Sequence, residues 1–523
     1  MQEIVKRING NIHTSGSNLK CGYCYLAQAN YKNQGMIKAL RYPLETILAA
    51  CSRERLGGTC IIEIIGDGET LLPDDVVPLI LGLLKEGHYV LVINNGTLTT
   101  RIHELVEQSE RDRTLCRLIF SFSLHFLELE KRNLLTAFAD NINFVKRKGI
   151  SFGVSLVCAD EYIEAADRIH RFCEEDLGGV TPNISPAREC DNSGNTVGIL
   201  SKYDKDTYYQ NIKKAFPTFN TESIYDIEHT DNHQFCYAGS WCFQVDFTTG
   251  MYSQCLRNAG PKYNFFENIE QELILEPVGT GCRAPYCWCG WTKTLNLIPG
   301  ESKYEPVDAL INAPEYKFMD IKSLSASRVN LADTNKEYTE AEKELSRQRS
   351  IRYEYFARQV ELLKFDFVEE KYEKFIQEAA VLLEEDLDPR LWDVVWLVVR
   401  YGYALLRTGQ AQRALDLASC YEDLNYNADY CYVMGLTYMN NGMIEQAEQS
   451  FCEATRRNFV IDKGANSEWP YLNLGLIYES RGDMEKAKAC YLECGNYEPA
   501  IQQLEGFSSS ISSSISFSIS FML

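Results

Sequence analysis

The chain has 523 residues, of which 45% are hydrophobic and 24% charged, values that are ordinary for a globular protein built from several domains. Its formal charge of -21 argues against a nucleic-acid partner, because binding to a phosphate backbone needs a basic surface. The sequence has no apolar run of the roughly 18 residues that a membrane span needs, and no apolar leader segment. We therefore expect no membrane contact and a cytoplasmic location.

Residues 1–190 alternate short apolar runs with amphipathic segments of helical period. The expected strands are 4–12, 59–65, 89–94, 116–123, 151–158 and 180–185. The expected helices are 43–55, 75–85, 100–110, 131–148 and 162–175. This order predicts an α/β fold with a parallel sheet, partly closed into a (β/α)6 barrel of the TIM type. The loops after the strands are then the expected place for functional groups.

The 19 cysteines divide into scattered and clustered positions. In a cytosolic protein they are expected to be buried thiols or metal ligands rather than disulfides. Scattered cysteines within apolar segments are expected in the core. The clustered ones are ligand candidates: Cys21 and Cys24, then Cys236, Cys242, Cys255, Cys282, Cys287 and Cys289.

Two segments with less regular patterns follow the first domain. Residues 191–230 are a polar connector with helical character, and residues 231–300 are a small Cys-, Trp- and Gly-rich α+β module. Within the module, residues 243–249 and 251–255 predict a hairpin around Gly250. Such a small core usually needs a metal to hold it together.

The C-terminal part is predicted to be helical, with a linker at 301–385 and repeats at 386–506. Gly402 and Gly435 are 33 residues apart, and Gly435 and Gly475 are 40 residues apart, which places an insertion around residues 458–467. Each glycine is followed 12 residues later by an alanine, and in the second and third repeats aromatic residues accompany the pair. Small residues where helices meet resemble the tetratricopeptide repeat, although an unrelated helical bundle is also possible. Residues 507–523 form a Ser- and Ile-rich tail that we expect to be disordered.

The loop after the first strand carries the sequence Thr-Ser-Gly-Ser-Asn-Leu-Lys-Cys-Gly-Tyr-Cys-Tyr at residues 14–25. Apart from serine in the first position, its spacing resembles the cluster loop of radical SAM enzymes, in which three cysteines hold a [4Fe–4S] cluster. The resemblance implies that Ser17, Cys21 and Cys24 are the metal-ligating positions. It also implies S-adenosylmethionine as a cofactor, an electron donor similar to flavodoxin or ferredoxin, and a 5′-deoxyadenosyl radical that attacks the substrate.

Three further segments resemble parts of the same family. Residues 66–72, Gly-Asp-Gly-Glu-Thr-Leu-Leu, resemble its Gly-Gly-Glu-Pro segment, and Asn94-Asn95-Gly96 resembles its Asn-Gly turn. Residues 121–125, Ser-Phe-Ser-Leu-His, end the fourth expected strand, where the family has a polar residue that faces the ribose of S-adenosylmethionine. A glycine lets the backbone approach a ligand, and a carboxylate can receive the methionine ammonium. The cofactor-binding candidates that follow are Gly66, Gly68, Glu69, Asn95 and Ser123. No catalytic acid or base can be assigned.

The later cysteines resemble the SPASM/twitch extension found in radical SAM enzymes that modify peptides. Cys236, Gly250 and Cys255 match its opening, whereas the downstream spacing differs from the usual pattern. The resemblance implies one auxiliary iron–sulfur cluster with ligands chosen from Cys236, Cys255, Cys282, Cys287 and Cys289. A structural zinc site is the alternative, since thiolates suit both metals.

The resemblance covers residues 1–300 and implies a radical SAM/SPASM protein that acts on a peptide or protein held by the repeats. Serine is a harder and less acidic ligand than cysteine, so Ser17 puts the cluster and the activity in doubt. Ser17 could be an introduced change, a natural loss, or a ligand that suffices under anaerobic conditions. The other hypotheses are an enzyme acting on a small molecule or a sugar, a degenerate scaffold that binds a partner through its repeats, and a zinc-stabilised adaptor.

Overall fold

The computed structural model describes residues 4–14, 16–28, 39–190, 196–219, 234–255, 260–280, 282, 295–299 and 331–509. It divides into two compact units. The first contains residues 1–260 and 269–350, and the second contains residues 261–268 and 351–523. None of the helices in the described ranges is both long enough and apolar enough to pass through a membrane.

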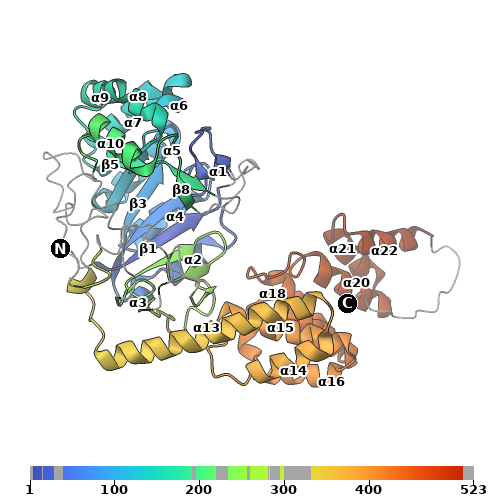
Figure 1. Cartoon of the computed structure of the whole chain (residues 1–523). Helices are drawn as coiled ribbons and strands as arrows, with labels where there is room; N and C mark the ends of the chain where they lie inside the picture. The colour runs from blue at the N-terminus through green and yellow to red at the C-terminus, as the bar shows by residue number, and fades with distance from the viewer. Residues whose placement is uncertain are drawn as a thin grey trace. The chain divides into compact units, whose positions relative to one another are not determined.

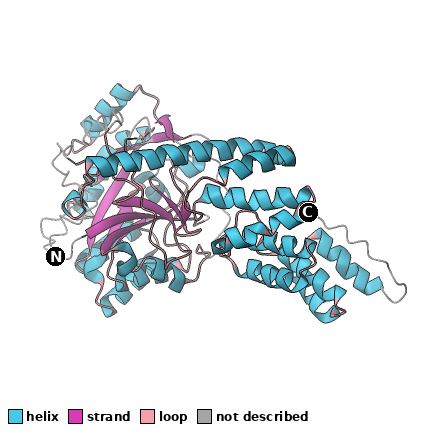
Figure 2. Ribbon diagram, turned by 90° about the horizontal axis from the view of Figure 1, so that it is seen from below, coloured by secondary structure: helices cyan, strands magenta, loops and turns pink. Residues whose placement is uncertain are grey.

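A parallel sheet forms the centre of the first unit (Figures 1 and 2). Its strands are β1 Ile4–Ile12, β2 Thr59–Gly66, β3 Tyr89–Asn94, β4 Leu118–Ser123, β5 Ser151–Cys158 and β6 Asn183–Pro186. They pair in chain order, each parallel to the next, which confirms the predicted parallel sheet. β6 ends the order of the described strands, and the partial closure into a barrel stays a prediction.

Helices follow these strands as expected, but the predicted helices 43–55 and 162–175 are each broken in two, and the predicted helix 131–148 begins only at Leu135, after a separate short helix. The observed helices are α2 Leu44–Ala50, α3 Arg53–Leu56, α4 Val76–Lys85, α5 Thr99–Arg111, α6 Phe126–Lys131, α7 Leu135–Arg147, α8 Asp160–Glu164 and α9 Ala166–Glu175. Ser52 starts α3 by accepting a hydrogen bond from the Arg55 amide, and Asn133 separates α6 from α7 with a φ of 57°. Helices α2, α4, α5 and α7 contact one another in that order, so they form one layer.

The hairpin predicted around Gly250 is present as β9 Cys242–Asp246 and β10 Met251–Ser253, which pair antiparallel. Gly250 has a φ of 80°, a conformation that glycine adopts without the penalty that a Cβ brings. β9 also pairs parallel to β1, with Phe243 opposite Ile8. The sequence did not indicate this pairing, which extends the main sheet and brings the end of β9 beside the ends of β1 and β2.

The remaining described elements of the first unit are short. They are α1 Tyr25–Gln28, η1 Leu115–Arg117, β7 Arg188–Cys190, β8 Thr196–Ile199, α10 Lys205–Ala215 and η4 Leu331–Asp333. Strands β7 and β8 pair antiparallel in a separate sheet.

The second unit is helical from residue 351 onward. Its helices are the later part of α13 Glu340–Val368, then α14 Tyr372–Leu382, α15 Trp392–Arg407, α16 Ala411–Ala414, α17 Asp416–Cys420, α18 Ala428–Asn440, α19 Ile444–Arg456, α20 Glu468–Ser480, α21 Met484–Glu493 and α22 Glu498–Ser509. The unit also contains η5 Glu422–Leu424 and the short strand β11 Tyr263–Asn264. Most of the Ser-rich tail, residues 510–523, lies outside the described residues.

Glycines lie where the repeat helices meet, as the sequence predicts. A Cβ added at Gly435 on α18 would lie 2.5 Å from the Phe451 ring on α19. At Gly475 on α20, an added Cβ would lie 2.3 Å from the Tyr491 ring on α21. The aromatic rings therefore fill the space that the missing side chains leave, and the paired helices approach closely.

Candidate functional site

The loop that follows β1 lies against the turn that follows β2. The Glu69 amide donates to the Gly16 carbonyl at 2.9 Å, and the Asp67 amide donates to the Ile12 carbonyl at the same distance. A Cβ at Gly68 would lie 2.0 Å from the Gly16 carbonyl oxygen. Only glycine at position 68 therefore allows the two backbones to come this close.

Glu69 is fully buried in this turn. Its Oε2 accepts a hydrogen bond from the Asn95 amide at 2.8 Å, and its Oε1 accepts one from the Leu71 amide at 3.2 Å. Burial raises the pKa of Glu69 to about 7, against the opposing effect of the two amides. The Glu69 carboxyl group therefore changes its charge near neutral pH.

The same loop is joined to the turn after β3. The Asn95 side-chain amide donates to Asn18 Oδ1 at 2.7 Å, and the Asn18 side-chain amide donates to Thr97 Oγ1 at 2.8 Å. Asn18 lies in the loop beside Ser17, whereas Asn95 and Thr97 follow β3. The predicted residues Ser17, Gly68, Glu69 and Asn95 are therefore brought to one edge of the sheet.

The far end of the loop is fastened to the segment after β4. The Tyr23 hydroxyl lies 2.6 Å from His125 Nδ1, and the Lys20 amide donates to Glu128 Oε1 at 3.2 Å. Burial lowers the pKa of His125 to about 4, so its imidazole is neutral at physiological pH. Ser123 is the last residue of β4 and lies at this same edge of the sheet.

The metal-ligating candidates of the loop provide two thiols and one hydroxyl. Burial raises the pKa of the Cys21 thiol to about 12, which keeps it protonated when no metal is bound. Ser17 Oγ accepts a hydrogen bond from the Leu19 amide at 3.1 Å. A [4Fe–4S] cluster that leaves one iron open for S-adenosylmethionine takes three thiolates. The donor set of this loop therefore does not fit such a cluster while position 17 is serine.

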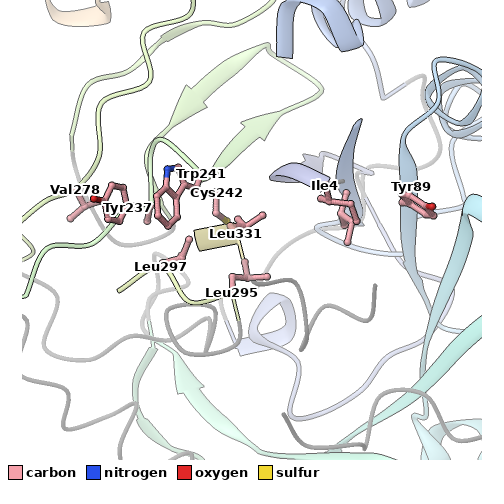
Figure 3. Close-up of a cluster of buried hydrophobic side chains, with 11 residues drawn as sticks. Ile4, Tyr89, Tyr237, Trp241, Cys242, Val278, Leu295, Leu297 and Leu331 are labelled. Carbon is pink, nitrogen blue, oxygen red and sulfur yellow. The ribbon is translucent and has the colours of Figure 1, made fainter. Parts of the chain in front are cut away.

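The cysteine-rich module contributes to a hydrophobic cluster that includes Tyr237, Trp241, Val278 and Leu297 (Figure 3). Cys236, Cys255 and Cys282 pack against this cluster. Cys236 exchanges backbone hydrogen bonds with Gly279, at 3.0 and 2.9 Å. Cys287 and Cys289 lie outside the described residues. Within the ranges that the structure describes, no three His, Cys, Asp or Glu side chains are grouped so that they could hold a metal ion.

Sequence reasoning did not find four contributors to this edge of the sheet: Asn18, Tyr23, Glu128 and His13. Asn18 and Tyr23 lie between the expected ligand positions of the loop, and Glu128 contacts the loop from the segment after β4. His13 joins three strands and is described below. Their partners are 54 to 233 residues away, so no local pattern marks them.

Comparisons with known proteins identify the helical repeats. The tetratricopeptide repeat model matches residues 428–459 and 470–501. The gap between the two matches falls in the region where the sequence predicted an insertion, residues 458–467. The helical region therefore contains tetratricopeptide repeats, as predicted.

The other two comparisons do not establish a family for the chain. No curated protein matches the chain. Among solved structures, the chain is similar to SuiB from Streptococcus suis, crystallised with S-adenosylmethionine bound, at 15% identity and a TM-score of 0.33. The match covers 51% of this chain and 63% of that one. Because this score is too low to establish a common fold, the functional proposal rests on this chain's own residues.

Proposed function

We propose that the first unit is a radical SAM/SPASM-type protein that binds S-adenosylmethionine at the C-terminal edge of its sheet. One observation carries the proposal. Four chain segments, namely the loop after β1 and the turns after β2, β3 and β4, are hydrogen-bonded to one another at that edge. Ligands of parallel α/β sheets bind at this edge.

The residues present suit S-adenosylmethionine better than they suit the cluster. The Glu69 carboxylate is the candidate partner for the methionine ammonium, and Gly68 lets the loop after β1 approach the turn that carries it. Asn95 and Ser123 are the candidates for polar contacts with the rest of the cofactor. With cysteine in position 17, the loop would offer three thiolates to a [4Fe–4S] cluster, which would supply an electron to the bound cofactor.

We further propose that the substrate is a peptide or protein held by the tetratricopeptide repeats. Stacked helical repeats present extended surfaces that suit such partners. The formal charge of -21 favours a basic segment, because opposite charge steers association. The Cys236–Cys289 group is the candidate for an auxiliary cluster, and three of its members pack against one core cluster.

Ser17 supports a second candidate function, a scaffold that keeps the fold and binds a partner without catalysis. The Ser17 hydroxyl oxygen accepts a hydrogen bond from the Leu19 amide of the same loop. The thiols that this loop offers to a cluster are then those of Cys21 and Cys24. Hard hydroxyl ligands bind iron–sulfur clusters less well than thiolates do. The two functions make different predictions for a single substitution.

The experiment compares the wild-type chain with Ser17→Cys and with Ser17→Ala as the matched control. Each protein is reconstituted anaerobically with iron and sulfide, its iron is counted, and release of 5′-deoxyadenosine from S-adenosylmethionine is measured. The proposal predicts that Ser17→Cys gains iron and cleaves the cofactor, whereas Ser17→Ala does neither. Equal iron in the cysteine and alanine variants, with no cofactor cleavage, would contradict it.

A further inference from the structure

His13 lies between two carboxylates at the C-terminal edge of the sheet. Its Nδ1 is 3.0 Å from Asp67 Oδ2, and its Nε2 is 2.9 Å from Asp246 Oδ2. His13 follows β1, Asp67 follows β2, and Asp246 ends β9. One imidazole ring therefore joins three neighbouring strands at the edge that also holds Glu69.

Backbone amides fix both carboxylates in place. Asp67 Oδ1 accepts a hydrogen bond from the Thr14 amide at 2.8 Å. Asp246 Oδ1 accepts hydrogen bonds from the Thr248 and Thr249 amides at 2.8 and 3.1 Å. Asp67 thus keeps its second oxygen for His13, whereas Asp246 Oδ2 also accepts a hydrogen bond from the Thr249 hydroxyl at 2.6 Å. Both carboxylates are fixed, and the ring has little freedom to turn away.

Two ordinary explanations for such a group do not apply here. The carboxylates contact opposite nitrogens of one ring, so the three side chains do not converge on a point where a metal ion could bind. The His13 side chain is 52% exposed, so the hydrogen bonds are not required to satisfy a buried polar group. The remaining role for His13 is to connect the strands.

We propose that His13 is a positioning residue that joins the turn carrying Glu69 to the β9–β10 hairpin. Its effect on the turn is direct, because Asp67 is two residues before Glu69 and its amide is bonded to the end of β1. Its effect on the hairpin is equally direct, because Asp246 starts the turn that leads to Gly250. The hairpin continues to Cys255, so the link connects the candidate cofactor turn with the cysteine-rich module.

The importance of this link for cofactor binding rests on the proposed function, whereas the link itself does not. The link between the two segments is tested in the full chain by amide hydrogen exchange on wild type, His13→Gln and Asp246→Asn. The matched control is His170→Gln, which alters an exposed histidine whose Nε2 is 2.8 Å from the Ala215 carbonyl. Exchange is compared in residues 66–72, in residues 242–253 and, as an internal reference, in β4 and β5.

Loss of the charged hydrogen bonds is expected to speed exchange about five- to tenfold in both segments of the His13→Gln variant. Asp246→Asn is expected to speed exchange in residues 66–72 as well, although it lies on the other side of the ring. β4, β5 and the His170→Gln control are expected to be unchanged. The proposal is wrong if Asp246→Asn speeds exchange in residues 242–253 alone. It is also wrong if exchange in β4 and β5 speeds up as much as in the two segments, as a general loss of stability would cause.

A second readout tests the positioning role. In the iron-loaded Ser17→Cys protein, His13→Gln is expected to weaken S-adenosylmethionine binding about tenfold, and His170→Gln to leave it unchanged. Unchanged affinity in a protein whose exchange has increased would overturn the positioning role. A parent protein that binds no S-adenosylmethionine would contradict the proposed function, and the exchange experiment would still decide whether His13 joins the two segments.

Discussion

His13 differs from an ordinary histidine in its protonation. Its hydrogen bonds to Asp246 and Asp67 raise its pKa to about 10, so the imidazole is charged at neutral pH. Because the folded pKa is above the ordinary value of 6.5, the stabilisation is complete below that pH and is lost as the pH rises toward about 10.

We therefore expect His13→Gln to destabilise the protein at about pH 6 and to have a much smaller effect near pH 10. The measurement is the difference in urea midpoint between wild type and variant at the two pH values. A difference of the same size at both would show that His13 is uncharged at about pH 6 or bound to neither carboxylate.

Glu69 is expected to change the stability in the same direction, over a lower pH range. Burial raises its pKa to about 7 from the ordinary 4.5, so ionisation opposes folding increasingly as the pH rises through that range. Ionisation also creates the anion that a cofactor ammonium needs. We predict that S-adenosylmethionine binds the Ser17→Cys protein more tightly at about pH 8 than at about pH 6, by calorimetry.

The matched variant is Glu69→Gln in the same background. It should bind the cofactor about tenfold or more weakly and lose that pH dependence, because the charged partner is gone. If the glutamine variant keeps the affinity and the pH profile of its parent, Glu69 is not the ammonium partner.

At the scale of single elements, the repeat glycines give a sharp prediction. Gly475→Ala would press a methyl group against the Tyr491 ring, whose hydroxyl is held by Glu479 at 2.7 Å and cannot easily shift. Overpacking of this kind costs about 1–3 kcal/mol. Chemical unfolding of the full chain, followed by helical circular dichroism, measures the loss.

Gly506 on α22 provides the control, because a Cβ there meets no heavy atom within 4 Å. Gly506→Ala should leave the stability unchanged or increase it by up to about 1 kcal/mol, since alanine is the better helix former. Equal effects of the two substitutions would mean that Tyr491 does not pack against position 475.

The sequence predicts the elements well where one local pattern dominates. β1, β3 and β5 have the predicted bounds, because β-branched and other apolar residues recur along each strand and polar or turn residues follow it. The break at Ser52 and the separate helix before Asn133 were not predicted, because hydrophobic periodicity continues across both residues while the interruptions depend on a cap and a single φ. Periodicity reports the buried face and says little about local backbone breaks.

At the scale of the whole molecule, the sequence predicts the parallel sheet and the helical repeats but not the contacts between distant segments. β9 pairs with β1 across more than 230 residues, and His13 meets Asp246 as a result of that pairing. The predicted site residues that lie at one edge of the sheet, such as Ser17, Glu69 and Asn95, all follow consecutive strands. Parallel strand order alone brings such residues to one edge.

The central claim is that S-adenosylmethionine binds where Gly68 lets the loop after β1 meet the turn after β2. Its most direct test is equilibrium binding of S-adenosylmethionine to the iron-loaded Ser17→Cys protein, with Gly68→Ala and Gly22→Ala made in that background. A Cβ at Gly68 would lie 2.0 Å from a backbone oxygen, whereas a Cβ at Gly22, in the same loop, meets nothing within 4 Å. We predict saturable binding that Gly68→Ala abolishes and Gly22→Ala preserves; absence of binding in the parent, or equal binding in both variants, would contradict the account.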